Sequence, residues 1–312
     1  INDIVSRSSW RVLLTMRFLN ALQKFRTLIL VHDTAEVSLS TLIPLFLHQG
    51  HRSACGGCIV SVQSGRIATI SAAYEVAQNM GVNIGEEVGY AVQFESHITS
   101  GTVIKYTTDI NLIREIVHYP VLNNYSVIIV NDVDKRSMYT DVLLGLLRKL
   151  NGQRDDLRIL LLSSSVDAEV FKKKFETNLE KHAVQKDTAA IICIRSEPTF
   201  FPNIYYLEKS TKNYIVEAVQ TCFRINIEED KGDVLVFMPG NDEVYEAIRE
   251  FYRCFKEEYM YAIAWHADSS NQMQIDAIEP SLRQKRRIIF AASAMMKSIL
   301  IEGITYVVDV GL

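Results

Sequence analysis

The chain has 312 residues, of which 48% are hydrophobic and 22% charged, so it is typical of a globular protein and not of a disordered or fibrous one. Its net charge of -4 excludes a general positive field that would draw it onto nucleic acid, and any RNA contact must be local. Five scattered cysteines exclude a disulfide framework and favour a reducing, intracellular location. No apolar run is long enough to span a membrane, and the length suits about two domains.

Short runs rich in Val and Ile alternate with longer helical patterns, which indicates a parallel sheet covered by helices. A basic amphipathic pattern at 5–31 predicts a helix that packs on the first lobe, with a transit peptide as the alternative. Strands are then predicted at 27–31, 58–62, 103–106, 125–130 and 157–162. Helices are predicted at 44–49, 68–80, 111–117 and 140–150. These elements form one complete doubly wound lobe.

A polar stretch without an apolar period, 176–187, predicts a boundary between two lobes. The second lobe is predicted to have strands at 189–194, 203–207, 234–237, 287–291 and 305–308, and helices near 214–223 and 242–259. The sequence therefore predicts an α/β protein with domains at 1–180 and 181–312.

Five blocks of this sequence, in order, resemble those of DEAH-box RNA helicases. Residues 85–95 and 102–109 resemble the segment between the family's second strand and its TDG motif, and 125–130 with 135–149 resemble the flanks of the DEAH box. Residues 156–162 and 166–169 frame the place of the Ser-Ala-Thr motif, and 232–237 and 303–309 fall at the fourth and fifth motifs. Within that family, these blocks are most similar to those of the spliceosome-associated branch. The resemblance implies two RecA-like lobes of the P-loop NTPase type, the second incomplete and ending before the arginine-finger motif.

The resemblance also locates the loop that holds ATP phosphates, which in this family reads Gly-x-x-Gly-x-Gly-Lys-Ser/Thr. Aligned on the segment 40–44, the three glycine positions hold Asp33, Glu36 and Ser38, and the lysine position holds Leu39. Carboxylates repel phosphate by about 1–4 kcal/mol per pair at roughly 4 Å, and Leu39 provides no charge. We therefore expect neither ATP nor Mg²⁺ to bind at Asp33, Glu36, Ser38, Leu39, Ser40 and Thr41.

The DEAH box aligns with Asn131-Asp132-Val133-Asp134. In the family the first acid holds Mg²⁺ and the second positions the attacking water, so Asn131 removes a charge from the metal site. Asp134 replaces the histidine that links this box to the Ser-Ala-Thr motif, here Ser163-Ser164-Ser165, where the hydroxyl of Ser165 leaves a partial link. We expect Asn131, Asp132 and Asp134 to form a degenerate box without a catalytic residue.

The sequence motifs that bind RNA in the family are also altered in this chain. Arg66 retains the second arginine of the family's Thr-Gln-Pro-Arg-Arg motif, and Thr108 with Asp109 retains two residues of TDG. The fifth motif is largely apolar at 291–298. The resemblance therefore implies only weak RNA contacts, at Arg66, Thr108 and Asp109.

A separate constellation raises a metal site as an alternative. His48 and His51 precede Cys55-Gly-Gly-Cys58, which has the spacing of a zinc or redox pair. The second pair that usually lies further along the chain is absent from the sequence, so we expect no metal there.

The main hypothesis is a catalytically inactive DEAH-box-like scaffold that takes protein partners and single-stranded RNA in RNA metabolism, with no membrane association, in the nucleus or cytoplasm. Two alternatives remain open. One is an RNA-stimulated ATPase, an ATP-dependent RNA helicase with an unorthodox phosphate loop. The other is a small metal-binding module at His48, His51, Cys55 and Cys58.

Overall fold

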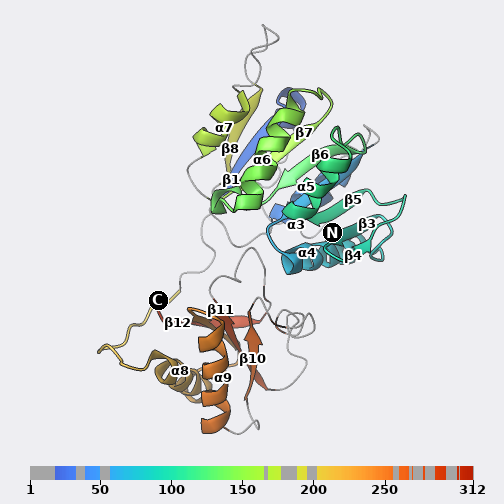
Figure 1. The fold of residues 1–312 in the computed structure, drawn as a ribbon. Coiled ribbons are helices and arrows are strands. Elements are labelled where there is room, and N and C mark those ends of the chain that lie inside the picture. The colour runs from blue at the N-terminus through green and yellow to red at the C-terminus, as the bar shows by residue number, and fades with distance from the viewer. Residues whose placement is uncertain are drawn as a thin grey trace. The chain divides into compact units, whose positions relative to one another are not determined.

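A computed structural model describes residues 18–32, 39–49, 57–164, 168–176, 188–194, 202–255, 260–266, 269, 277, 285–292, 301 and 303–311 (Figure 1). The chain divides into two compact units, Ile1–Phe201 and Pro202–Leu312. Each unit is a sheet with helices packed on it, which confirms the predicted α/β class. Within the described residues, no helix is both long and apolar enough to cross a bilayer.

The first unit is built on an eight-stranded sheet with the order β4-β3-β5-β2-β6-β7-β1-β8. Its strands are β1 (Thr27–His32), β2 (Cys58–Gln63), β3 (Val88–Val92), β4 (Glu95–His97), β5 (Ile104–Thr108), β6 (Tyr125–Val130), β7 (Arg158–Ser163) and β8 (Ala189–Ile194). All neighbouring pairs are parallel except β3 and β4 at one edge. The carboxyl ends of β2, β6, β7 and β1 therefore lie at the same edge of the sheet.

Helices cover both faces of this sheet (Figure 1). They are α3 (Leu39–Gln49), α4 (Arg66–Met80), α5 (Asp109–His118), α6 (Met138–Asn151) and α7 (Ala168–Glu176), with a further helical segment at 18–24. Successive residues of a strand point to opposite faces of the sheet, so each central strand contributes side chains to the apolar clusters on both faces. Ile29 packs in the cluster with α5, α6 and α7, whereas Leu28 and Leu30 pack with α3 and Phe18.

The structure corrects the predicted boundary between the lobes. β8 was assigned to the second lobe, but it pairs in parallel with β1 from Thr27 to His32 and so completes the first sheet. Along the chain, the first unit ends at Phe201 and the second begins at Pro202, whereas the predicted boundary was between 180 and 181. The polar composition of 176–187 indicated a boundary because loops within a domain share the composition of linkers.

The predicted strand at 203–207 is wrong, because none of its residues is in a strand. Its Tyr205 and Tyr206 are 86% and 87% exposed, so the apolar run has no surface against which to pack. Conversely, β3 and β4 were not predicted. They are short and carry a glycine and charged residues, which hide the strand pattern.

The second unit has a four-stranded sheet with the order β10-β11-β9-β12, and its described pairs are parallel. Its elements are α8 (Tyr214–Glu228), β9 (Asp233–Met238), α9 (Asn241–Cys254), β10 (Met260–Trp265), β11 (Arg286–Ala292) and β12 (Ile304–Asp309). Both helices pack on one face through residues such as Val219 and Phe251, and Trp265 lies in a smaller cluster with Leu235 and Ile289. The strand β10 was not predicted from the sequence.

A buried ion pair joins β11 to β9 in this unit. Arg287 has no exposed side-chain area, and its Nε and Nη2 lie 3.0 and 2.9 Å from Asp233 Oδ2. The backbone N–H of Arg287 donates to Asp233 Oδ1 at 2.9 Å, and its Nη1 donates to the Ala277 carbonyl at 3.2 Å. Removing one partner of such a pair leaves a buried charge without its counter-ion.

We therefore expect Asp233→Ala to lower the free energy of unfolding of the second unit by about 3–5 kcal/mol. Urea unfolding followed by the fluorescence of the buried Trp265 measures this change. The matched control is Glu217→Ala, which removes an exposed pair with Arg224 and should cost less than about 1 kcal/mol. Equal losses in the two variants would contradict the assignment.

Candidate functional site

The carboxyl ends of the central strands bring the predicted site residues to one edge of the first sheet. Open doubly wound sheets bind their ligands outside this edge. Asn131 and Asp132 follow β6, Ser164 follows β7, and Leu39 opens α3 after β1. The site is thus assembled from the ends of different strands. The loop residues Asp33, Glu36 and Ser38 lie outside the described residues.

Asn131 and Asp132 are adjacent but have different surroundings. The buried amide of Asn131 donates to the Val62 carbonyl at 2.8 Å and to Ser61 Oγ at 3.2 Å, so it ties β6 to β2. Asp132 adopts φ 54°, a left-handed conformation that is uncommon for residues other than glycine. Its Oδ2 accepts a hydrogen bond from Lys135 Nζ at 2.8 Å. Asp132 is therefore a carboxylate placed at the ligand-binding edge and already paired with a cation.

Asp134 connects the end of β6 to the end of β7. Its carboxylate accepts hydrogen bonds from Ser164 Oγ at 2.7 Å and from the Ser164 backbone N–H at 3.2 Å. Burial opposes ionisation of Asp134, but the hydrogen bonds from Ser164 outweigh it and hold the pKa below its ordinary value. A link between the two motifs is thus present and runs through Ser164, whereas the sequence pointed to Ser165, which lies outside the described residues.

The first turn of α3 contains the described residues of the expected phosphate loop. Leu39 is half-buried and packs on the apolar cluster beneath α3, so it provides no charge. The Thr41 hydroxyl donates to Glu75 Oε1 at 3.1 Å, and the Ser40 carbonyl accepts from the Tyr106 hydroxyl at 3.0 Å. Ser40 occupies the position at which phosphate loops place the hydroxyl that binds Mg²⁺. The sequence shows this hydroxyl, but the replaced glycines and lysine outweighed it in the prediction.

The predicted RNA-binding residues gather at the same edge, because Gln63 of β2 pairs with Thr108 of β5. Arg66 opens α4, and its guanidinium donates to the Gln93 carbonyl at 2.7 Å and pairs with Glu95 at 2.5 Å. Asp109 is buried at the start of α5, and this burial raises its pKa. The RNA role of Arg66, Thr108 and Asp109 stays a prediction.

The alternative metal site is only partly visible, because His51 and Cys55 lie outside the described residues. His48 Nε2 lies 3.6 Å from Glu87 Oε2. Burial raises the pKa of the Cys58 thiol to about 12. Among the residues that the structure describes, no group of three or more His, Cys, Asp or Glu side chains could hold a metal ion.

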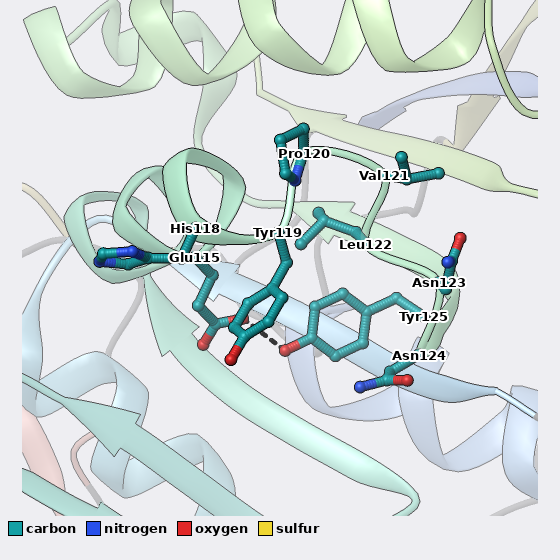
Figure 2. A pocket seen from close by; sticks show the side chains of 9 residues that line it. All are labelled: Glu115, His118, Tyr119, Pro120, Val121, Leu122, Asn123, Asn124 and Tyr125. Atoms are coloured by element: carbon teal, nitrogen blue, oxygen red, sulfur yellow. Dashed lines mark hydrogen bonds between the residues drawn. The ribbon is translucent and has the colours of Figure 1, made fainter.

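A pocket of about 420 Å³ lies at the opposite edge of the sheet, where α5 ends and β6 begins (Figure 2). Glu115 and Tyr125 point toward one another in it, and the Tyr125 hydroxyl donates to Glu115 Oε2 at 2.5 Å (Figure 2). The buried ammonium of Lys105 contacts Glu115 and donates to the Tyr125 oxygen at 2.7 Å. Burial, together with Glu115, raises the pKa of Tyr125. The charges of Lys105 and Glu115 compensate each other within this triad. The triad lies at the amino end of β6, whereas Asp132 follows the carboxyl end, so it is not part of the candidate site.

The architecture defines the class of protein first: the fold is RecA-like. The crystal structure of the Escherichia coli DEAH/RHA helicase HrpB matches it with a TM-score of 0.76, covering 96% of this chain and 36% of that chain at 23% identity. No protein-family model matches the chain.

The relatives then narrow the class. Over 295 residues the chain is 36% identical to the "Probable ATP-dependent RNA helicase DHX35 homolog" of Caenorhabditis elegans, covering 93% of this chain and 40% of that protein. It is 33% identical over 298 residues to the human "Probable ATP-dependent RNA helicase DHX35", covering 93% of this chain and 42% of that protein. The chain therefore spans about two fifths of these relatives. It is related to the DEAH-box RNA helicases, and the predicted resemblance is confirmed.

Two expectations drawn from the sequence are wrong: that the chain is not an enzyme, and that it takes no ATP or Mg²⁺. The finding that overturns them is that the relatives are named probable ATP-dependent RNA helicases. The prediction counted the charges of the loop alone and not those of side chains that follow other strands at the same edge of the sheet, such as Lys135.

The described residues fit a nucleoside triphosphate with Mg²⁺ in their donor chemistry. Mg²⁺ in such sites commonly takes one or two protein ligands and completes its shell with water and phosphate oxygens. Asp132 provides a carboxylate and Ser40 a hydroxyl, from the ends of β6 and the start of α3. Ser40 would hold the metal, which when bound neutralises charge on the phosphates, and Asp132 would act on water at the same edge of the sheet.

The Asp134–Ser164 contact gives a titration that can be checked. Ser164→Ala removes the hydroxyl donor, so the pKa of Asp134 should rise toward the ordinary value for an aspartate. A carboxylate whose pKa is lower in the folded than in the unfolded chain stabilises the folded chain at a pH above the unfolded value of about 3.9. The variant should therefore lose about 1 kcal/mol of unfolding free energy at neutral pH. That loss should vanish as the pH falls through the folded pKa. Carbon-13 NMR of labelled aspartates measures the midpoint, and an unchanged midpoint would contradict the contact.

Proposed function

We propose that the chain is the two-lobed motor of an ATP-dependent RNA helicase, in which RNA stimulates hydrolysis of ATP at the carboxyl edge of the first sheet. The observation that carries this proposal is 33–36% identity over 93% of the chain to proteins named ATP-dependent RNA helicases. The retention of Ser40 and Asp132 at the same edge of the first sheet supports it. The replaced glycines and lysine then make an unorthodox phosphate loop and not an inactive one.

Asp132 has the chemistry that hydrolysis needs at this edge. Water attacks the terminal phosphorus, the bond to the bridging oxygen breaks, and a proton leaves the water as inorganic phosphate and ADP form. A carboxylate that is paired and partly exposed can orient that water and receive the proton. Asp132 is 15% exposed in its side chain and is held by Lys135. Asn131 and Asp134 hold the surrounding turn through β2 and β7.

We expect single-stranded RNA to raise the rate at which the purified chain releases phosphate from ATP. Asp132→Ala should lower that rate by at least about 100-fold, because the group that orients water is removed. A coupled phosphate-release assay with and without oligouridylate measures both effects.

The matched control for this assay is Asp155→Ala. It removes a carboxylate that is 84% exposed and paired with Arg26 ahead of β7, at the other edge of the sheet. Its rate should equal that of the unaltered chain. Phosphate release that persists in Asp132→Ala, or that fails in every variant, would end the proposal.

RNA binding at Arg66 is a separate part of the proposal. Arg66 lies on the edge with Thr108, and its side chain is 34% exposed. Its present partner Glu95 is a carboxylate, which a phosphate can replace because both are anions with oxygen acceptors.

We expect Arg66→Ala to weaken binding of single-stranded RNA and to flatten the dependence of log affinity on log salt by about 0.7, as the loss of one phosphate contact requires. Fluorescence anisotropy of labelled RNA across a salt series measures this slope. Arg253→Ala, which removes the same charge from a side chain that is 74% exposed on α9, should leave the slope unchanged. A common slope for all three proteins would refute a phosphate contact at Arg66.

A further inference from the structure

The turn after β2 places a hydroxyl group beside the proposed RNA contact. Gln63 ends β2, Arg66 opens α4, and the residues between them are Ser64 and Gly65. The Ser64 hydroxyl therefore lies two positions before the arginine that is proposed to meet RNA phosphate. In the family motif Thr-Gln-Pro-Arg-Arg, Ser64 stands at the proline, which has no hydroxyl. The family motif does not account for this group.

The Ser64 hydroxyl contacts the turn that follows β6. Ser64 Oγ donates to Asp132 Oδ2 at 3.5 Å, and the same carboxylate oxygen accepts from Lys135 Nζ at 2.8 Å. Asp132 is the carboxylate that the proposed function assigns to the attacking water. A group that contacts it directly can therefore change the rate of hydrolysis.

The backbone next to this contact joins the same two turns. The Asn131 backbone N–H donates to the Val62 carbonyl at 3.1 Å, and the buried Asn131 amide donates to the same carbonyl at 2.8 Å. These bonds hold the ends of β2 and β6 together directly before Ser64 and Asp132. Because the strand ends are tied, a shift of the turn after β2 reaches Asp132 through the Ser64 hydroxyl.

The other end of the turn after β6 is anchored to α5. Ser137 caps α6 by accepting from the Thr140 backbone N–H at 3.1 Å. The buried carboxylate of Asp109 accepts from the hydroxyls of Ser137 and Thr140 at 3.5 and 3.4 Å. The segment from Asp132 to Ser137 is thus held at its α6 end, and Ser64 contacts its opposite end.

The length of the Ser64 contact leaves room for it to tighten. Hydrogen bonds from a hydroxyl to a carboxylate usually join oxygens about 2.5–2.7 Å apart, so the 3.5 Å contact would reach that length after a shift of about 1 Å. The same turn leads into Arg66, whose guanidinium is held by the Gln93 carbonyl and by Glu95. A change of partner at Arg66 therefore acts on the turn that carries Ser64.

We propose that Ser64 is a positioning residue that couples RNA binding at Arg66 to the orientation of Asp132. This inference rests on the proposed function and adds a residue to it. An RNA phosphate that replaces Glu95 on Arg66 shifts the start of α4, and the Ser64 hydroxyl moves with it. The shortened hydrogen bond then holds the Asp132 carboxylate in the direction that the attacking water requires.

The test is phosphate release from ATP by the whole chain during a titration with oligouridylate. Each titration gives the ratio of the RNA-saturated rate to the rate without RNA, and the RNA concentration at half stimulation. Ser64→Ala should lower the ratio by roughly 5-fold, as the loss of one hydrogen bond predicts. The RNA concentration at half stimulation should stay the same, because Arg66 still meets the phosphate.

Three further variants complete the test. Ser64→Thr keeps the hydroxyl and should recover most of the ratio. Arg66→Ala removes the phosphate contact and should raise the RNA concentration at half stimulation. Ser100→Ala removes an exposed hydroxyl from the turn before β5, at the opposite edge of the sheet, and should change neither value. Thermal unfolding of each variant confirms that it is folded.

The outcomes separate this inference from the proposed function. If RNA stimulates the unaltered chain and Ser64→Ala keeps the same ratio, the assignment of Ser64 is overturned while the proposed function stands. A higher RNA concentration at half stimulation in Ser64→Ala would make the residue an RNA contact and would also overturn the assignment. So would a ratio in Ser64→Thr as low as that in Ser64→Ala. If the unaltered chain releases no phosphate, the proposed function fails and this inference fails with it.

Discussion

Parallel pairing of β2, β6, β7 and β1 is the constraint on which the rest of the first unit depends. Strands buried on both faces are largely apolar along their length, so most of the polar chemistry lies at the strand ends. Because the strands run the same way, those ends coincide. Residues that are more than 90 positions apart in the chain, such as Ser40 and Asp132, thereby come to the same edge of the sheet by topology alone.

The sequence predicted the parts of the fold that follow from periodicity. Val and Ile runs gave the central strands, and the Leu143 and Leu147 spacing gave α6. It missed β3 and β4, where Gly89 and charged residues obscure the pattern, and it put β8 in the wrong lobe. Which sheet a strand joins depends on contacts across the chain, and local composition does not contain them.

The sequence predicted which residues form the candidate site, but not which contacts these residues make. Alignment with the family motifs located Asn131, Asp132 and Asp134, yet no spacing rule gives the Lys135 ion pair, the Ser164 hydrogen bonds or the Lys105–Glu115–Tyr125 triad. The prediction that ATP does not bind was wrong for the same reason. A pocket's electrostatic field sums over every strand end that faces it, so a charge count along one loop is incomplete.

The acid at position 134 has a consequence for how the two strand ends communicate. A histidine in this place would gain and lose its proton within the range of cellular acidity, since imidazole titrates near pH 6.5. Asp134 stays ionised throughout that range, because Ser164 holds its pKa below the ordinary value. The hydrogen bonds from Ser164 to Asp134 therefore join the ends of β6 and β7 at every pH in this range.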